Sequence, residues 1–305
     1  MTTNILKLKP HFEYRVWAGT TLKQAFNLAP DGIGEAWLIS ALEGKAAVIS
    51  NLPSQPDLLK FYSDPSNANF FASYNLTHPY PLLAKIIDAR ADLSVQIHPD
   101  DDYARQFGML GKTECWYVLD TAAHNEVVLG HHASTLADFK QRIAKRQWSQ
   151  LLKSQPIHPG AFIYVPARKI HAIKANTLIY ELQQSSDITY RVYDYDRLDR
   201  GRQRELHLDH VYNLIETPDR TMPPEAISAR PDYLVANHQF NLKLITNVNS
   251  TTYAFPEAKW VQLSVIEGCA TIDDLPANLY DSFLIAHQSS FTITGSCKCL
   301  VSYIK

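Results

Sequence analysis

An amide and an imidazole two positions apart are the first residues that could do metal chemistry. They belong to residues 93–101, which read Leu-Ser-Val-Gln-Ile-His-Pro-Asp-Asp. Side chains alternate along a strand, so a strand here points Ser94, Gln96 and His98 to one face. That face offers an amide oxygen and an imidazole nitrogen together.

A carboxylate with a lysine beside it forms the second candidate group. Residues 111–119 read Gly-Lys-Thr-Glu-Cys-Trp-Tyr-Val-Leu. The same alternation places Lys112, Glu114 and Trp116 on one face of a predicted strand. A third stretch, residues 160–171, reads as a strand, a proline-containing turn and then His171.

Two histidines, a carboxylate and an amide on adjacent strands of a small barrel predict a zinc site. Zinc takes imidazole nitrogen and carboxylate oxygen in roughly tetrahedral geometry, and it keeps an open position when the site is catalytic. The alternative is that His98 and His171 are ordinary, partly buried histidines, since the chain contains 12. Spacing alone does not show that the three stretches meet in space.

The elements that must position these residues are mostly short strands. Segments rich in Val, Ile, Tyr and Leu predict strands at residues 161–165, 178–183, 189–195, 242–248, 260–266, 282–286 and 298–304. Short strands without long helices between them favour an antiparallel sandwich or barrel over a parallel βαβ sheet. The predicted fold class is therefore all-β with a few short helices.

Two helices interrupt the strands. Thr135 and Asp138 form a capping-box-like start, and apolar residues at helical spacing continue the pattern to about Lys153. A second, shorter helix begins near Pro99, where carboxylates in the first turn suit the helix dipole, and it ends near Gly108.

A proline-rich segment predicts the domain boundary. Residues 216–232 contain four prolines, which break both helix and strand pairing. The length of 305 residues allows two domains. We therefore expect a catalytic domain at residues 1–225 and a smaller β domain at residues 226–305.

Composition and charge exclude several classes of protein. The 29 Lys and Arg against 31 Asp and Glu give a net charge of −2, without the positive field of a nucleic-acid binder. No apolar stretch approaches the ~20 residues of a membrane helix, and the N-terminus has no secretory h-region. The four cysteines match no disulfide framework, which favours a reducing, cytoplasmic setting. Cys297 and Cys299 are expected to be buried thiols on one strand face.

Residues 93–101 followed by 111–119 closely resemble the paired signature of type I mannose-6-phosphate isomerases, which are zinc-dependent enzymes of the cupin fold. Further segments look like family segments in the same order, at residues 17–19, 34–37, 80–85 and 187–197. The resemblance covers the whole chain, and the length resembles the short bacterial branch. It implies two cupin domains of the jelly-roll type.

The resemblance also implies one Zn²⁺ per chain. Its ligands would be the residues at the matching positions: Gln96, His98, Glu114 and His171. Residues 160–171 are similar to the second cupin motif, but Arg168 stands where that motif has glycine. Ile173 replaces a tyrosine of the longer enzymes, so a substrate contact at that position is not carried over.

The activity that the resemblance implies is interconversion of mannose 6-phosphate and fructose 6-phosphate through an enediol. That reaction needs a base, a group that shuttles the hydroxyl proton, and positive charge near the developing oxyanion. The candidates are Lys112, Glu181, Asp187 and Arg191, the last three matching the family stretch Glu-x₄-Ser-Asp-x₃-Arg. The sequence does not decide which group is the base: Lys112, Glu181, Asp187 and a zinc-bound water are all candidates. Arg191 would stabilise either the enediolate or the phosphate. A surface lysine, a solvated strand carboxylate, a turn former and a salt-bridged arginine are the ordinary alternatives.

Two other functions stay open at this point. One is a non-catalytic cupin that binds a sugar phosphate as a sensor, which the intact ligand set and Arg191 disfavour. The other is an isomerase of a related sugar phosphate, which Arg168 and Ile173 leave open. The C-terminal domain looks like a second cupin with a lone His287 and is expected to be structural. The expected partner is a small-molecule sugar phosphate, with no nucleic acid and no membrane, and the sequence does not fix the oligomeric state.

Overall fold

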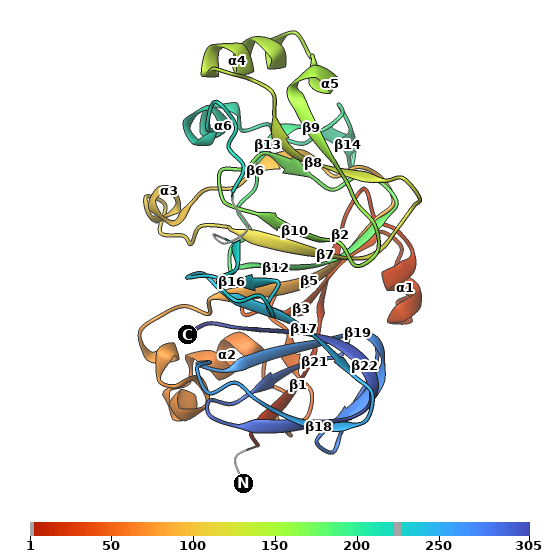
Figure 1. The fold of residues 1–305 in the computed structure, drawn as a ribbon, viewed down its shortest axis with the longest axis vertical. Helices are drawn as coiled ribbons and strands as arrows, with labels where there is room; N and C mark the ends of the chain where they lie inside the picture. The colour runs from red at the N-terminus through yellow and green to blue at the C-terminus, as the bar shows by residue number, and fades with distance from the viewer. Residues whose placement is uncertain (1–2, 223–226) are drawn as a thin grey trace. The chain divides into compact units, whose positions relative to one another are not determined.

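The computed structural model describes residues 3–222 and 227–305 (Figure 1). Its helices are short: α1 (Thr21–Ala25), α2 (Leu58–Ser63), η1 (Pro65–Phe71), η2 (Tyr74–Leu76), α3 (Asp101–Arg105), α4 (Leu136–Ala144), α5 (Trp148–Leu151) and α6 (Leu208–Leu214). None of the helices in the described ranges is long and apolar enough to span a membrane.

Strands make up most of the regular structure. In the first half of the chain they are β1 (Ile5–Lys9), β2 (His11–Tyr14), β3 (Ile33–Ile39), β4 (Val48–Ile49), β5 (Leu82–Ala89), β6 (Val95–Ile97), β7 (Glu114–Thr121), β8 (Glu126–His131) and β9 (Leu152–Pro156). In the second half they are β10 (Phe162–Val165), β11 (His171–Ala172), β12 (Thr177–Gln184), β13 (Tyr190–Tyr193), β14 (Leu198–Asp199), β15 (Arg202–Gln203), β16 (Val235–Ala236), β17 (Asn241–Asn247), β18 (Ser250–Ala254), β19 (Val261–Ile272), β20 (Leu275–Ala277), β21 (Ser282–Ile285) and β22 (Ser290–Tyr303).

These strands form several sheets, and the pairings that surround the site are antiparallel. A nine-stranded sheet has the order β16-β17-β22-β19-β21-β1-β4, with β18 on β22 and β20 on β19. A six-stranded sheet has the order β10-β7-β12-β5-β3-β2, and a five-stranded sheet has the order β13-β6-β11-β8-β9. Strands β14 and β15 pair with each other. The predicted β-rich, antiparallel architecture is confirmed, whereas the assignment of two cupin domains stays a prediction.

The chain divides into two compact units by its internal contacts. The first comprises Met1–Phe12, Ala36–Lys85 and Pro223–Lys305, and the second comprises Glu13–Glu35 and Ile86–Met222. The division before residue 223 lies close to the boundary expected at 225, and residues 223–226 of the predicted linker lie outside the described residues. Whether 1–225 and 226–305 act as catalytic and structural domains stays a prediction.

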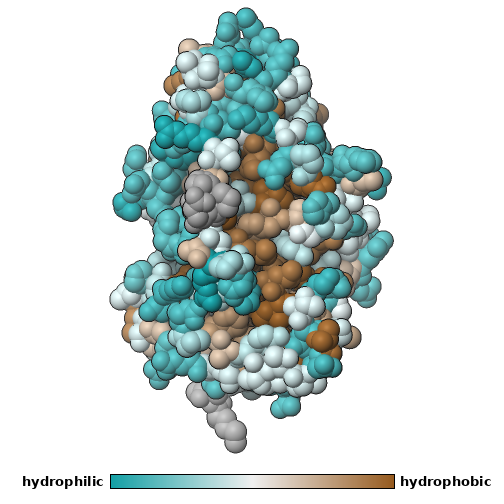
Figure 2. Space-filling view, viewed as in Figure 1, coloured by the Kyte–Doolittle hydropathy of each residue, from teal (hydrophilic) through white to brown (hydrophobic). Residues whose placement is uncertain are grey.

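The second unit builds one of its cores between helices and the five-stranded sheet. Phe139 and Ile143 of α4, with Leu151 of α5, pack in one cluster with Val95 and Ile97 of β6. Figure 1 shows α4, α5 and α6 beyond this sheet, at the end of the unit. Hydrophilic residues gather at that end on the face drawn in Figure 2. The helices therefore cover one face of the sheet and leave its other face for the site.

The helix expected from Thr135 to about Lys153 is wrong in its length. Thr135 Oγ1 does accept from the Asp138 N–H at 3.1 Å, as the capping pattern predicts. The helix ends at Ala144 because Arg146 adopts a left-handed backbone with φ of 55°, which a right-handed helix cannot continue. No glycine or proline marks this break in the sequence. The second expected helix is confirmed as α3, capped by Asp100.

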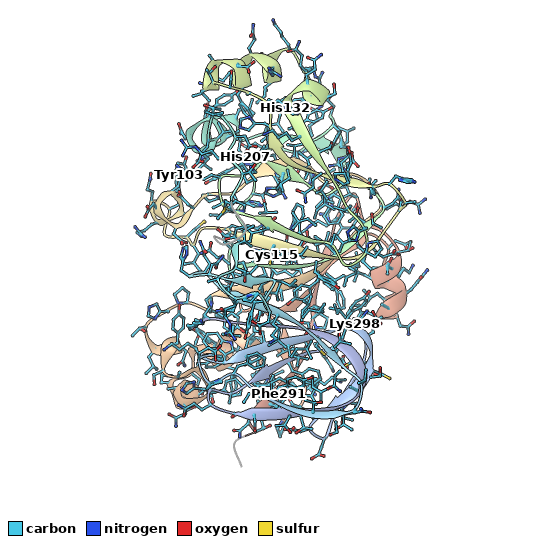
Figure 3. All side chains as sticks on the ribbon, in the orientation of Figure 1. Tyr103, Cys115, His132, His207, Phe291 and Lys298 are labelled. Atoms are coloured by element: carbon cyan, nitrogen blue, oxygen red, sulfur yellow. The ribbon has the colours of Figure 1, made fainter. Side chains whose placement is uncertain are left out.

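The first unit has its own core on β17, β19, β21 and β22. Phe291 of β22, labelled in Figure 3, lies in this cluster. Cys297 and Cys299 belong to it as well, with their sulfur atoms 3.6 Å apart. Both are buried free thiols on one face of β22, as the sequence predicts.

Candidate metal centre

Three of the predicted site residues form one row across the five-stranded sheet. Gln96 of β6 lies directly opposite His171 of β11 on one side and opposite Arg191 of β13 on the other. Directly opposed residues in antiparallel strands point to the same face. Their neighbours in sequence, such as Val95 and Ile97, point to the helix-covered core. Gln96, His171 and Arg191 therefore share the face that the helices do not cover.

A second row of site residues comes from the six-stranded sheet. Glu114 of β7 lies opposite Gln183 of β12, and Trp116 lies opposite Glu181. On the other side of β7, Val165 of β10 lies opposite Glu114, and Ile163 lies opposite Trp116. Cys115, labelled in Figure 3, stands between Glu114 and Trp116 in sequence and so points to the opposite face. This face of β7 and β12 thus carries three polar acceptors beside apolar residues.

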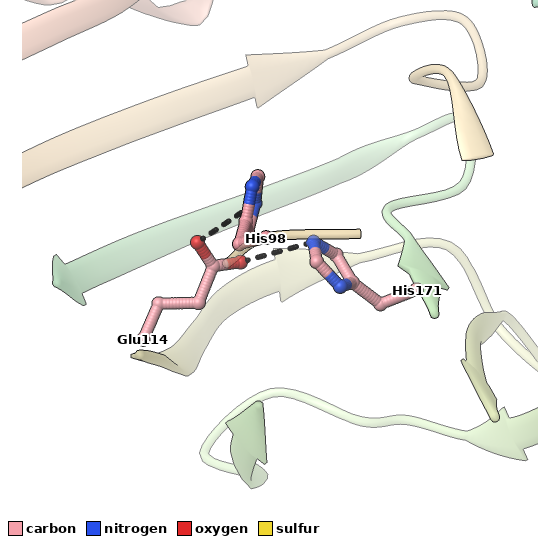
Figure 4. Close-up of side chains that lie close together, drawn as sticks. All are labelled: His98, Glu114 and His171. Carbon is pink, nitrogen blue, oxygen red and sulfur yellow. Dashed lines mark ion pairs between the residues drawn. The ribbon is translucent and has the colours of Figure 1, made fainter. Parts of the chain in front are cut away.

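Three buried side chains, carried by these strands or lying next to them in sequence, come close together in Figure 4. The ligand atoms of His98, Glu114 and His171 all lie within 4.8 Å of one another. Glu114 Oε2 lies 3.4 Å from His98 Nε2, and Glu114 Oε1 lies 3.3 Å from His171 Nε2. Each of the three residues is 1% exposed or less. The structure therefore brings together the two histidines and the carboxylate that the sequence selected.

Electrostatics keeps this cluster as neutral imidazoles around a carboxylate. Burial, with the charge of Lys112 second, lowers the pKa of His98 from 6.5 to about 3. Burial also lowers the pKa of His171. For Glu114 burial alone would raise the pKa, but Lys112, His98 and His171 outweigh it and hold that pKa well below its usual range.

The hydrogen bonds of the cluster leave three of its inward-facing nitrogen and oxygen atoms without a partner. His171 Nδ1 lies 2.8 Å from the Lys169 carbonyl oxygen, which only accepts, so Nδ1 carries the proton and Nε2 presents a lone pair. His98 Nε2, His171 Nε2 and Glu114 Oε2 are buried without a hydrogen-bond partner. His171 Nε2 and Glu114 Oε1 are therefore two acceptors 3.3 Å apart, an arrangement that is favourable when a cation lies between them. The donor set of nitrogen and oxygen fits a zinc ion.

Lys112 lies beside this carboxylate, as predicted. Its Nζ is 3.4 Å from Glu114 Oε2, and the residue is 5% exposed. Its backbone N–H donates to the Pro99 carbonyl at 2.9 Å. Gly111 permits this approach, because a Cβ there would lie 2.6 Å from the backbone nitrogen of Asp101. Lys112 is therefore a buried cation at the site rather than a surface lysine.

Trp116 connects two buried carboxylates, which the sequence did not indicate. Its Nε1–H lies 3.2 Å from Glu114 Oε1 and 3.1 Å from Glu181 Oε1. Its ring also packs edge-on against His171, with centroids 5.6 Å apart. Glu181 is 3% exposed, so it is not a solvated strand carboxylate. The period-two pattern placed Trp116 on the correct face but gave no sign of this bridge.

Arg168 adopts a left-handed backbone, the conformation that favours glycine. Its φ is 67°, in the left-handed region that costs a non-glycine residue about 1–2 kcal/mol. Its N–H donates to the His98 carbonyl at 2.8 Å, and its Nε lies 3.1 Å from Asp100 Oδ2. The turn before His171 therefore holds Arg168 in a strained conformation that these two contacts stabilise.

The remaining two candidates differ in their surroundings. Asp187 lies in the turn between β12 and β13 and is exposed. Arg191 is half-buried, and its Nε is buried without a hydrogen-bond partner. Within residues 3–222 and 227–305 no carboxylate pairs with this guanidinium, whereas the nearby Arg204 pairs with Asp194 at 2.6 Å. Arg191 is thus not the salt-bridged arginine of the ordinary alternative.

Comparison with known proteins identifies the family. A family model described as the catalytic domain of type I phosphomannose isomerase matches residues 5–142. The chain is 39% identical to the Bacillus subtilis protein named "Probable mannose-6-phosphate isomerase GmuF", with 99% of each chain covered. It is 33% identical to "Mannose-6-phosphate isomerase ManA" of the same organism, with 100% of each covered. This chain belongs to the type I phosphomannose isomerase family.

The fold agrees with that assignment. The crystal structure of mannose 6-phosphate isomerase from Bacillus subtilis superposes with a TM-score of 0.89 at 33% identity, covering 99% of this chain and 100% of that one. The resemblance drawn from residues 93–101 and 111–119 is therefore confirmed.

Proposed function

We propose that this protein is a zinc-dependent aldose–ketose isomerase that interconverts mannose 6-phosphate and fructose 6-phosphate. The observation that carries the proposal is the buried group of His98, Glu114 and His171, in which His98 Nε2, His171 Nε2 and Glu114 Oε2 have no hydrogen-bond partner. The substrate is taken from the names of the relatives, which are mannose-6-phosphate isomerases, and the alignments cover 99% and 100% of their length.

Four residues would hold the metal: His98, Glu114, His171 and Gln96. Gln96 is included because it lies directly opposite His171, within reach of the same ion. A bound zinc would polarise the oxygens at C1 and C2 of the sugar as a Lewis acid. The tautomer of His171 is already set for this role by the Lys169 carbonyl.

The chain's own groups would move the protons. In the aldose-to-ketose direction one proton leaves C2 and is delivered to C1, and one hydroxyl proton passes from O2 to O1. We favour Glu181 over Asp187 as the carbon base, since Glu181 is buried and anchored by Trp116, whereas Asp187 is exposed. Lys112, whose Nζ lies 3.4 Å from Glu114 Oε2, would shuttle the hydroxyl proton.

Arg191 would supply fixed positive charge. It shares a sheet face with Gln96 and His171, and it lacks a carboxylate partner among the described residues. A guanidinium is always protonated and binds phosphate or an enediolate oxygen through its fork of N–H groups. Burial lowers the pKa of Arg191, and the charges of Arg204 and Arg15 lower it further, so an anion there is favourable.

The test combines turnover with metal analysis. The protein should convert mannose 6-phosphate in a coupled assay, lose activity with chelator, regain it with Zn²⁺ and contain one zinc per chain. His98→Ala and His171→Ala should each lower zinc content, whereas the exposed His238 replaced by alanine should not. Full zinc in both site variants would remove the ligand assignment. A zinc-loaded protein that binds mannose 6-phosphate without turning it over would instead be the sensor.

A further inference from the structure

Gln183 is a fully buried side chain at the site that no motif selected. It lies directly opposite Glu114 in the β7–β12 pairing, so it points to the same face as the metal cluster. Its exposure is 0%. It is also two residues after Glu181, which places both residues on one face of β12.

The amide of Gln183 is held in one orientation. Its Nε2 donates to the backbone carbonyls of Gln184, at 3.0 Å, and Ser186, at 2.5 Å. The strand end is fixed in turn, because Gln184 Oε1 accepts from the Thr113 N–H at 2.9 Å. Both amide hydrogens are therefore used, and the Gln183 carbonyl oxygen is the atom left over.

That oxygen has no partner of its own. Gln183 Oε1 is buried without a hydrogen bond, which costs free energy unless a bound group supplies a donor. An amide oxygen only accepts hydrogen bonds, so it recognises a hydroxyl and not a phosphate dianion. Its neighbours on this face, Glu114 and Glu181, are acceptors as well.

We infer that Gln183 is a substrate-binding residue whose carbonyl oxygen accepts a hydrogen bond from a hydroxyl of the sugar chain. The inference rests on the proposed function and deepens it by assigning the hydroxyl-bearing chain of the substrate to the acceptors of β7 and β12.

Binding of a non-reacting ligand tests this assignment without turnover. The probe is a hexitol 6-phosphate, the substrate reduced at its carbonyl carbon so that it cannot isomerise, measured by calorimetry on zinc-loaded protein. Gln183→Met removes the acceptor together with the two amide N–H donors, and it keeps the length and burial of the side chain. The Kd of the hexitol phosphate should rise about five- to tenfold, while the Kd of inorganic phosphate and the zinc content should stay unchanged.

A matched control separates this effect from the loss of any buried amide. Gln262 is 1% exposed and bonds Tyr80 and Ser302 in the other unit. Gln262→Met should leave both dissociation constants unchanged even if it lowers the melting temperature. An unchanged hexitol phosphate Kd in Gln183→Met, an equal loss of phosphate binding, or loss of zinc would each overturn the inference.

The ligand side provides a second measurement should Gln183→Met fail to fold. Hexitol 6-phosphates that lack one hydroxyl at a time are titrated into the unmodified protein, and one of them should bind about five- to tenfold more weakly. Equal binding of the whole series would overturn the inference. Turnover of mannose 6-phosphate by the unmodified protein is measured separately. Absent turnover counts against the proposed function, whereas normal turnover with unaffected binding in Gln183→Met counts only against Gln183.

Discussion

The buried ring of His98 should make the metal-free protein sensitive to mild acid. In the unfolded chain this imidazole takes up a proton at its ordinary pKa of 6.5, whereas in the folded protein its pKa is about 3. A group whose folded pKa is depressed adds stability above its unfolded pKa, and that stability is lost as the pH falls from 6.5 towards 3. The buried, uncharged ring therefore favours the folded state most at neutral pH.

The magnitude follows from the same two pKa values. Between pH 7 and pH 5 the folded ring stays neutral, while the unfolded ring changes from mostly neutral to almost fully protonated. At 1.36 kcal/mol per pKa unit this lowers the free energy of unfolding by about 2 kcal/mol. The pKa of His171 is lowered as well, so its contribution has the same sign.

Urea denaturation of chelator-treated protein at the two pH values measures the effect. His98→Gln stays neutral throughout, so its loss of stability between pH 7 and pH 5 should be smaller than that of the unmodified protein by about 2 kcal/mol. His238→Gln, at an exposed position, should show the unmodified dependence. An equal loss in His98→Gln and the unmodified protein would mean that the folded state does not hold this ring neutral, and the electrostatic account of the cluster would fail.

Two further predictions concern one residue before and one residue after the expected domain boundary at residue 225. Arg191→Ala should keep its zinc and lower kcat by about two to three orders of magnitude, the loss typical of one positioned electrostatic donor. If Arg191 binds only the phosphate, KM should rise with little change in kcat. Steady-state kinetics at matched zinc content measures both parameters. If neither kcat nor KM changes, Arg191 does not belong to the active site. His287→Ala should leave turnover within about threefold, because its ring bonds only the Ala258 carbonyl among the described residues. Loss of zinc in that variant, measured by metal analysis, would contradict a structural role for the C-terminal segment.

Which site residues share one face of a strand could be predicted from the sequence, because side chains alternate strictly along a strand. Period two placed Lys112, Glu114 and Trp116 on one face, and the structure confirms that this face meets His98 and His171. The meeting itself could not be predicted from spacing, because it depends on how the two sheets pack. The family resemblance carried that information instead.

Other features lacked any local signal. A single glutamine within a strand has no sequence signature, so Gln183 was missed although its face was fixed by Glu181 two residues earlier. The end of α4 was missed because a non-glycine residue, Arg146, adopts the left-handed backbone. Exposure to solvent also depends on the tertiary structure. The sequence alone therefore did not distinguish the exposed Asp187 from the buried Glu181.

The alternation along β6 has a consequence for how such a site can change over evolution. Gln96 faces the site, while Val95 and Ile97 on either side face the helices. In β13 Arg191 is flanked in the same way by Tyr190 and Val192. A point substitution can therefore alter what the site binds without disturbing the apolar layer that stabilises the sheet. Insertion of one residue would exchange the two faces at once, so we expect these strands to tolerate changes of residue type far better than changes of length.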